Sequence, residues 1–365
     1  MSGMVQSRRG PIRPLPWTRH AKLLLAHSLS VTRLSQMIIR LRRRPLILRY
    51  HRVYPDGREP LYELGVPRAL FEAHLDFLVR HFTVVGLEDV CAAVIEGRRP
   101  PRRVAAITFD DGYKDNLTEA LPALRARRLP ATVFVAAGLV ESGGHFWWDR
   151  CAAAVANAPR GTHLIRIGSS SERVALEGLP SRRQVVDRVC EHLKVMPHAA
   201  AMECLAGLEE SFGRTRGPGH AVLTWAEVRR LQAGGIEIGS HTLDHPVLSR
   251  VGDKEAERQI VESRRLIEAR LGSPVRFFAY PNGKRDDISP EVVAAVRRAG
   301  YRAAVTTIEG RPGRSSDPFR LERIGATVGA STDAQGRFDE ALFAAELSGV
   351  LGALFLRRRR DRALH

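Results

Sequence analysis

The sequence predicts an α/β domain built on a parallel sheet or barrel, and two observations indicate this fold class. From about residue 45 onward, short apolar segments alternate with helical patterns, which is typical of repeated βα units. The chain has 365 residues, 44% hydrophobic and 27% charged, enough for one large α/β domain or a core with an insertion. Six segments are expected to form strands: 46–50, 104–109, 131–136, 236–240, 275–280 and 303–307.

Helix signals fall between these predicted strands. Thr224 and Glu227 have the spacing of a capping box at the start of a helix. Pro290 and Gly300 bracket another helix, with proline at its first turn and glycine past its end. Apolar residues at helical spacing predict a third helix over 253–271.

Four regions are expected along the chain. Residues 1–44 form a basic N-terminal arm that is partly helical, and residues 45–335 form the main domain. Within that domain, residues 146–222 fit the strand and helix alternation poorly, so we interpret them as a helical insertion that caps one end of the barrel. Residues 336–365 are expected to form an amphipathic helix and an Arg-rich tail.

The formal charge of +17 is concentrated at the two ends of the chain. Residues 1–44 carry ten Lys and Arg and no Asp or Glu, and residues 357–365 carry five Arg and one Asp. These segments hold 14 of the 17 net positive charges. A DNA-binding domain more often carries its cations on the folded body, so we expect no nucleic-acid partner.

Length and composition also bear on location. No apolar run reaches the roughly 18 to 20 residues that span a bilayer, and residues 23–26 are too few for the apolar region of a secretory signal. We therefore expect a cytoplasmic protein, with its basic ends as a route to peripheral membrane contact. The four cysteines lack metal-site spacing and are expected to be free thiols: Cys91, Cys151, Cys190 and Cys204.

Three segments place chemistry-bearing residues just after predicted strands, where α/β folds place their sites. The first presents two adjacent carboxylates, Asp110 and Asp111, at a turn, where one can bind a metal while the other handles protons. The second presents His241 and His245, which can converge on one metal if the chain between them makes a helical turn. With Asp111 they form a two-His, one-carboxylate set that leaves positions open for water and substrate.

The third segment, residues 276–283, ends in Tyr-Pro-Asn-Gly. Such a tight turn can aim backbone N–H groups at a developing oxyanion. Arg276 could pair with a carboxylate in the site, and the alternative is a surface arginine at the start of a strand.

These motifs, in this order, resemble the NodB-homology polysaccharide deacetylases, carbohydrate esterase family 4, over roughly residues 45–330. The resemblance implies a distorted (β/α) barrel that hydrolyses N-acetyl groups of an amino-sugar glycan. It also implies a divalent metal, usually zinc, with cobalt, nickel or iron in some relatives. The implied roles are Asp110 as base, Asp111, His241 and His245 as metal ligands, Arg276 as the partner that positions the base, and Tyr280 as an oxyanion-stabilising backbone group. Residues 50–53, 71–78 and, more loosely, 146–149 resemble the branch that includes exopolysaccharide deacetylases.

The sequence departs from the family at the general acid. Many members carry a late Leu-x-x-His motif, but here the only histidine after Tyr301 is His365, in the arginine-rich tail. His51, at the end of the first predicted strand, is the best substitute, and the alternative is a histidine that only packs. Protonated Asp110 could also return the proton to the leaving amine.

Two other functions are compatible with this sequence. A non-catalytic glycan-binding relative would keep the fold, although the complete Asp–Asp–His–His set argues against it. A membrane-surface scaffold that uses the basic tails is compatible with catalysis. The expected absence of an export signal favours an intracellular or lipid-linked sugar precursor over a mature cell-wall polymer as substrate.

Two patterns at the chain ends suggest contact with an anionic membrane. Apolar residues recur at helical spacing over 343–354 and run into four arginines, which suits an interfacial helix. In the N-terminal arm, four residues share one face of a candidate helix: Arg33, Gln36, Arg40 and Arg43. The alternatives are that residues 343–354 pack as the last helix of the domain, and that the arm is an organelle transit peptide.

Overall fold

The computed structural model describes residues 16–351, apart from 32–33, 42, 59, 99–100, 169 and 213–220. Its contacts divide the chain into two compact units. The larger unit is residues 42–328, and the smaller unit combines residues 1–41 with residues 329–365. Every residue predicted for the active site belongs to the larger unit.

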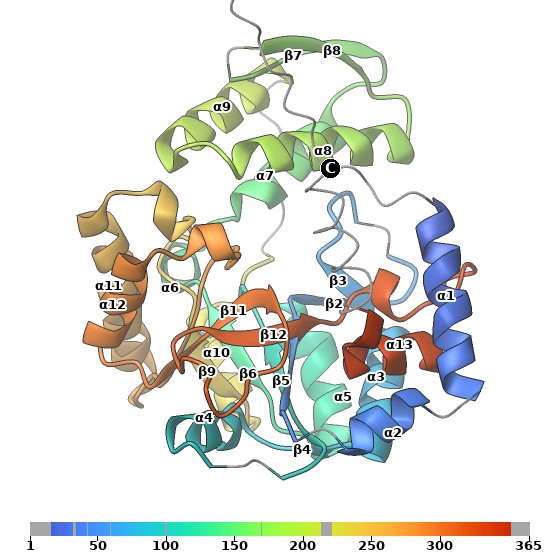
Figure 1. Cartoon of the computed structure of the whole chain (residues 1–365). Helices are drawn as coiled ribbons and strands as arrows, with labels where there is room; N and C mark the ends of the chain where they lie inside the picture. Colours follow the sequence, from blue (N-terminus) through green and yellow to red (C-terminus); the bar gives the residue numbers. More distant parts are fainter. Residues whose placement is uncertain are drawn as a thin grey trace, which may run out of the picture. The chain divides into compact units, whose positions relative to one another are not determined.

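Seven parallel strands close into a barrel in the larger unit (Figure 1). In order around the ring these are β1 (Leu46–Tyr50), β12 (Leu321–Gly325), β11 (Ala303–Glu309), β10 (Phe277–Ala279), β9 (Glu237–Ser240), β6 (Thr132–Val135) and β5 (Val104–Phe109). The ring closes because β5 pairs with β1 along the whole length of β1. The short strand β4 (Thr83–Val84) joins the start of β5, and β2 (Arg52–Tyr54) pairs with β3 (Gly65–Pro67). This closed ring confirms the predicted (β/α) barrel.

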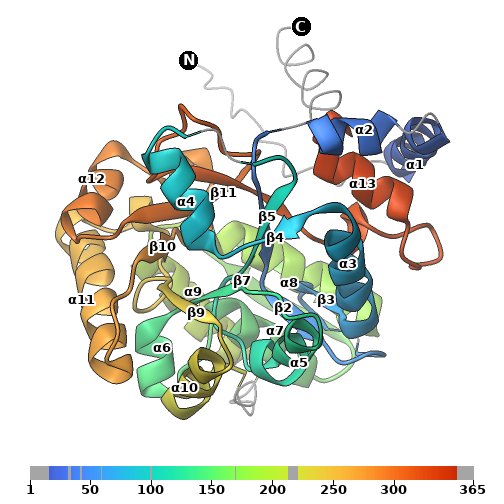
Figure 2. The same ribbon diagram turned by 90° about the horizontal axis from the view of Figure 1, so that it is seen from below.

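Helices form an outer layer around these strands (Figure 2). They are α3 (Arg68–His81), α4 (Leu87–Ile95), η1 (Asn116–Ala120), α5 (Leu121–Ala126), α6 (Ala137–Ser142), α10 (Trp225–Ala233), α11 (Asp253–Leu271) and α12 (Pro290–Arg298), with single 3₁₀ turns η2 (Leu248–Arg250), η3 (Arg285–Asp287) and, at the unit boundary, η4 (Val328–Ala330). The predicted capping box is present, since Thr224 accepts the N–H of Glu227 at the start of α10. The predicted helices that start at Pro290 and span 253–271 are also confirmed as α12 and α11.

Along each barrel strand, every second side chain points into the barrel interior. This alternation determines which side chains reach the mouth of the barrel. Ile47 and Ala106 lie in the buried interior cluster, together with residues of β6, β10, β11, β12 and α4. Because alternate residues of a strand point to the same side, Arg49 and then His51 follow Ile47 toward the carboxyl end. On β5, Asp110 follows Ala106 in the same way.

The insertion forms its own small layer, at the top of Figure 1. It contains α7 (Trp147–Asn157), α8 (Leu179–Leu193) and α9 (His198–Ser211), together with an antiparallel hairpin of β7 (Thr162–Ile167) and β8 (Ser170–Ala175). Residues 213–220 of the predicted insertion lie outside the described residues. The helical prediction did not anticipate the hairpin, whose strands carry mostly polar side chains on their exposed face.

The smaller unit contains α1 (Pro16–Val31), α2 (Leu34–Leu41) and α13 (Glu340–Ser348). Phe343, Leu347 and Leu351 are buried, so the apolar stripe over 343–354 packs within this unit as far as it is described, which supports the alternative of a last packed helix over an interfacial one. The Arg-rich tail, Arg33 and the side chain of Gln36 lie outside the described residues. Among the helices that the structure describes, each is too short or too polar to cross a bilayer.

Candidate active site

Asp111, His241 and His245 meet at the carboxyl end of the barrel. Asp111 follows β5 and the two histidines follow β9, and one ligand atom from each lies within 4.8 Å of the others. Asp111 Oδ1 is 3.4 Å from Nε2 of each histidine. Asp111 and His245 have positive φ angles of 77° and 58°, a conformation that non-glycine residues adopt rarely and that clusters at functional sites.

Gly112, the residue after the two carboxylates, is required by the local packing. Its φ is +73°, and a Cβ at this position would lie 2.9 Å from Val135 Cγ1 of the neighbouring strand β6. A side chain here would strain the backbone and displace β6. Glycine therefore allows the turn that directs Asp111 into the site.

The three side chains fit a divalent cation. Both carboxylate oxygens of Asp111 are buried and have no hydrogen-bond partner among the described residues, and an unpaired buried carboxylate is costly. His241 Nδ1 is 2.7 Å from the backbone oxygen of Ala279, so if it donates there, Nε2 is left for a cation. Burial, and then the nearby charge of His241, lowers the pKa of His245 to about 3, which keeps the neutral, metal-binding form of its imidazole.

Asp110 is held by Arg323 rather than by the predicted Arg276. Arg323 Nη1 and Nη2 donate to the two carboxylate oxygens of Asp110 at 2.7 and 2.6 Å, and Nε donates to the backbone oxygen of Thr306. Burial alone would raise the pKa of Asp110, but the charge and hydrogen bonds of Arg323 outweigh it and hold this pKa well below its usual range. Asp110 is therefore ionised and fixed in orientation.

Arg276 lies at the other end of the barrel, which corrects its predicted role. It precedes β10, whereas Asp110 follows the carboxyl end of β5, and all barrel strands run parallel. The Arg276 guanidinium is half-exposed and pairs with Glu237 at 2.6 Å and with Glu88 at 3.4 Å. The sequence signal that could have found Arg323 is the short apolar pattern around it, with Leu321 and Ile324 on a strand that was not predicted.

His51 is brought to the carboxylates as expected. Its Nε2 lies 3.9 Å from Asp110 Oδ2, and its side chain is 27% exposed. Burial lowers the pKa of His51, while the charges of Asp111 and Asp110 act in the opposite direction. The His51 imidazole thus lies beside the Asp110 carboxylate and stays partly open to solvent.

The backbone N–H of Tyr280 is already used within the barrel. It donates to Val305 at 3.2 Å, and the Tyr280 hydroxyl donates to the backbone oxygen of Phe319. The next residue is proline, and the N–H groups of Gly283 and Lys284 donate within the turn. This leaves Asn282, at φ 59°, as the residue of this turn whose N–H has no partner among the described hydrogen bonds.

The start of the insertion packs directly on a candidate ligand. The rings of Phe146 and Trp148 meet His245 edge-on, with centroids 5.5 and 4.7 Å away. Trp148 Nε1 donates to the hydroxyl of Tyr113, which donates to Asp149. Because Tyr113 follows the two carboxylates by two residues, this chain of hydrogen bonds ties the insertion to the catalytic turn.

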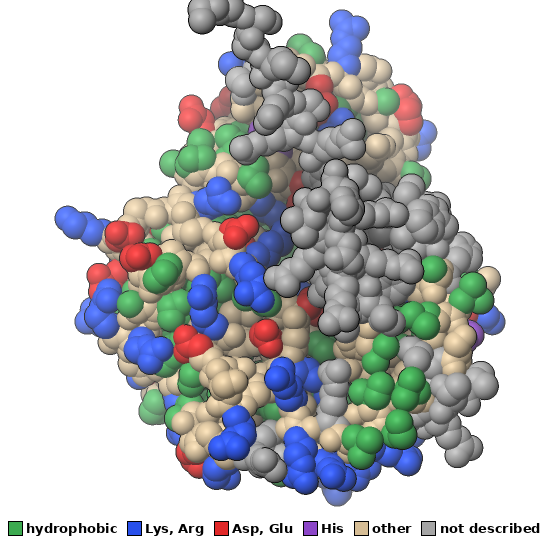
Figure 3. Space-filling view, viewed as in Figure 1, with side chains coloured by type: hydrophobic (Ala, Val, Ile, Leu, Met, Phe, Trp, Pro, Cys, Tyr) green, Lys and Arg blue, Asp and Glu red, His purple; other side chains and the backbone are tan. Residues whose placement is uncertain are grey.

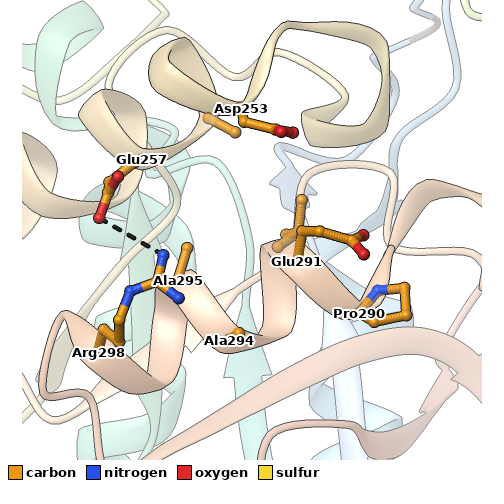
Figure 4. Close-up of a pocket in the computed structure, with 9 residues that line it drawn as sticks. Asp253, Glu257, Pro290, Glu291, Ala294, Ala295 and Arg298 are labelled. Carbon is orange, nitrogen blue, oxygen red and sulfur yellow. Dashed lines mark ion pairs between the residues drawn. The ribbon is translucent and has the colours of Figure 1, made fainter.

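Two cavities differ in their relation to this site. A groove of about 450 Å³ lies between α11 and α12, and its charged lining residues include Asp253, Glu257 and Arg298 (Figure 4). None of the residues that line it belongs to the predicted site. A much smaller cavity is lined by Trp147 and His245, among others, and so joins the insertion to the candidate ligands.

The chain is similar in sequence to known proteins. The family model described as polysaccharide deacetylase matches residues 97–304. The chain is 21% identical over 297 residues to "Putative polysaccharide deacetylase YxkH" of Bacillus subtilis, which covers 81% of this chain and 76% of that protein. It is 34% identical over 87 residues to a chitooligosaccharide deacetylase of Sinorhizobium fredii, which covers 23% of this chain and 38% of that protein.

Two solved structures share the fold. The Streptococcus pyogenes deacetylase PplD, in complex with acetate, matches with a TM-score of 0.52 and 19% identity, over 78% of this chain and 92% of that one. IcaB from Ammonifex degensii matches with a TM-score of 0.54 and 20% identity, over 84% of this chain and 98% of that one.

Proposed function

The chain belongs to the polysaccharide deacetylase family, and from this premise we propose that it is a metal-dependent enzyme that removes N-acetyl groups from an amino-sugar glycan or glycan precursor. The observation that carries the proposal is a buried, unpaired carboxylate, Asp111, facing two imidazoles beside a second carboxylate that an arginine fixes in place. A degenerate binding relative would commonly lack one of these groups, so the non-catalytic alternative is less well supported.

Asp111, His241 and His245 would hold the ion. Two imidazoles and one carboxylate suit zinc, and cobalt, nickel or iron are the alternatives. Such an ion would polarise the acetamide carbonyl and lower the pKa of a water toward about 7. Its identity is part of the proposal.

Asp110 would orient the attacking water and accept its proton. The low pKa that Arg323 imposes makes Asp110 a weak base, so it can serve only a water that has itself become acidic. The two hydrogen bonds from Arg323 leave the carboxylate little freedom to rotate, which favours one approach direction for the water.

The leaving amine and the oxyanion need two further groups. We assign His51 to protonate the amine, because it lies beside Asp110 and remains partly open to the mouth. Asp110 could return the proton instead. We assign the N–H of Asn282 to the oxyanion in place of Tyr280, because the Tyr280 N–H is used within the barrel.

The test is acetate release from acetylated chito-oligosaccharides and from acetylated lipid-linked sugars, measured together with metal content. We expect about one divalent ion per chain and acetate release that a chelator abolishes and added zinc restores. A fully metal-loaded protein that binds these glycans but releases no acetate from any of them would favour the glycan-binding alternative.

The smaller unit supports a second proposal, contact with an anionic membrane. Leu24, Met37 and Leu41 are 73%, 50% and 56% exposed, and Figure 3 shows hydrophobic side chains gathered at lower right, in the region where Figure 1 draws α2. Large exposed apolar side chains on a basic segment suit a bilayer interface. The membrane-facing surface would then be on α1 and α2 rather than on α13. The cytoplasmic location stays a prediction from the sequence.

A further inference from the structure

Arg49 is a cation at the mouth of the barrel that the proposed reaction does not use. It follows Ile47 on the interior face of β1, and its neighbours across the sheet are Thr108 and Gly325. Only 14% of its side chain is exposed. A Cβ at Gly325 would lie 2.9 Å from Arg49 Nη2, so the absence of a side chain there leaves room for the guanidinium.

The guanidinium of Arg49 is incompletely paired. Nη1 is buried and has no hydrogen-bond partner among the described residues. Nη2 lies 3.6 Å from Oε1 of Glu309, whose side chain is 55% exposed. An ion pair at this distance with an exposed carboxylate is weak and screened by solvent. A buried donor without an acceptor is costly, so this position favours an incoming oxygen ligand.

The surrounding charges favour an anion in particular. The fully buried Arg323 already forms an ion pair with Asp110 through the two hydrogen bonds described above. Burial, and then the positive charge of Arg323, lowers the pKa of Arg49, which remains a cation because arginine titrates far above neutral pH. Arg323 thus takes both oxygens of Asp110, and the ion pair that Arg49 makes among the described residues is with the exposed Glu309.

We propose that Arg49 binds an anionic group, a phosphate or a carboxylate, that the substrate carries next to its acetamido sugar. This inference rests on the proposed function and narrows its substrate class to acidic glycans or sugar phosphates. The planar guanidinium matches both groups through parallel hydrogen bonds. The same chemistry would also bind free acetate, so the test separates the two sources.

The experiment measures binding to the metal-loaded full-length chain by titration calorimetry. The probes are N-acetylglucosamine, N-acetylglucosamine 1-phosphate, a disaccharide of glucuronate and N-acetylglucosamine, and sodium acetate. We expect the parent protein to bind at least one charged sugar about tenfold more tightly than the neutral one. Arg49→Met should remove this preference without weakening the neutral sugar, and Arg49→Lys should retain part of it.

Arg265→Met is the matched control, because it removes the same charge from a 70% exposed position on α11 and should leave the preference unchanged. Equal affinity of the parent for neutral and charged sugars would overturn the inference, as would a preference that survives in Arg49→Met. An Arg49-dependent affinity for acetate alone would overturn it too, since Arg49 would then bind the product. Acetate release is assayed in parallel: a charged-sugar preference that depends on Arg49, in a protein that hydrolyses nothing, contradicts only the proposed function.

Discussion

Arg323 donates hydrogen bonds to both carboxylate oxygens of Asp110, from which it is separated by 213 positions in the sequence, and both side chains are buried. Bidentate pairs of this kind combine charge with a fixed geometry. The pair orients the carboxylate that the proposed reaction needs, so its disruption is the most direct mutational probe of the site.

Arg323→Met should be far more damaging than Arg276→Met. Breaking a buried ion pair leaves an uncompensated charge and typically costs about 3–5 kcal/mol, whereas the half-exposed pairs of Arg276 are worth about 0–1 kcal/mol. We expect a large drop in the free energy of unfolding and loss of acetate release for Arg323→Met, and near-parent values for Arg276→Met. Denaturant unfolding and an acetate assay measure both. Comparable losses of stability and acetate release in the two variants would support the predicted role of Arg276 in the site.

His241→Ala and Asp110→Asn should separate metal binding from proton transfer. We expect His241→Ala to lose stoichiometric metal and activity together. Asp110→Asn should keep its metal and lose about 100- to 10,000-fold in turnover, because an amide cannot accept the proton. Elemental analysis and acetate release are measured on the same samples, with His163→Ala in the hairpin as a control. Full metal occupancy in His241→Ala would remove it from the ligand set.

His51→Ala should slow hydrolysis and change the shape of its pH profile, because a general acid must be protonated when the amine leaves. We expect kcat to fall more than KM rises. The comparison is a pH series of acetate release for the parent, His51→Ala and His51→Gln. Profiles that superimpose in rate and shape would make His51 a packing residue, and Asp110 would then remain as the proton donor.

Asp149→Asn should change how stability depends on pH. Burial raises the pKa of Asp149 to about 6, while an unfolded Asp titrates near about 3.9. The folded state therefore binds more protons between about pH 4 and 6, and its stability falls as the pH rises through this window. Asp149→Asn should abolish that fall. Between pH 4 and pH 7 its free energy of unfolding should rise relative to that of the parent by at most about 3 kcal/mol. Urea unfolding at several pH values tests this, and parallel curves for parent and variant would contradict it.

Membrane contact should depend on the exposed apolar residues of α1 and α2. We expect sedimentation with anionic but not neutral vesicles, weakened by salt. The triple variant Leu24→Ser, Met37→Ser, Leu41→Ser should bind at least about tenfold more weakly, since each apolar side chain contributes about 1.5–3 kcal/mol when fully buried. Leu164→Ser, which is 65% exposed in the hairpin, is the control. Equal recovery of every protein in the supernatant would end the proposal.

Local patterns predicted one part of the site well, and long-range contacts decided the rest. Asp111, His241 and His245 could be selected because each follows an apolar strand, and the parallel strands bring their ends together. Arg323 could not be assigned in this way, because nothing near it in the sequence shows which carboxylate it reaches. Tyr280 shows the same limit, because only the sheet pairing shows that its N–H already donates to Val305.

The smaller unit illustrates a different limit of sequence reasoning. An apolar stripe at helical spacing shows that a helix has a face to bury, but that face can be buried equally well against protein or in lipid. Phe343 and Leu347 are buried in this unit, whereas Leu24 and Met37, which also lie in helical segments rich in apolar residues, remain exposed. Only the packed structure distinguishes the two cases.

The position of β1 between β5 and β12 has a consequence for dissecting the protein. The span that matches the family model, residues 97–304, contains all three candidate ligands and Asp110, but it omits β1 and β12. A fragment cut to that span would be an open sheet of five barrel strands, with β5 and the truncated β11 as its edge strands. The unpaired backbone groups of these edge strands could hydrogen-bond to other copies of the fragment. Such a fragment should aggregate, and any soluble remainder would still lack the arginine that orients its base.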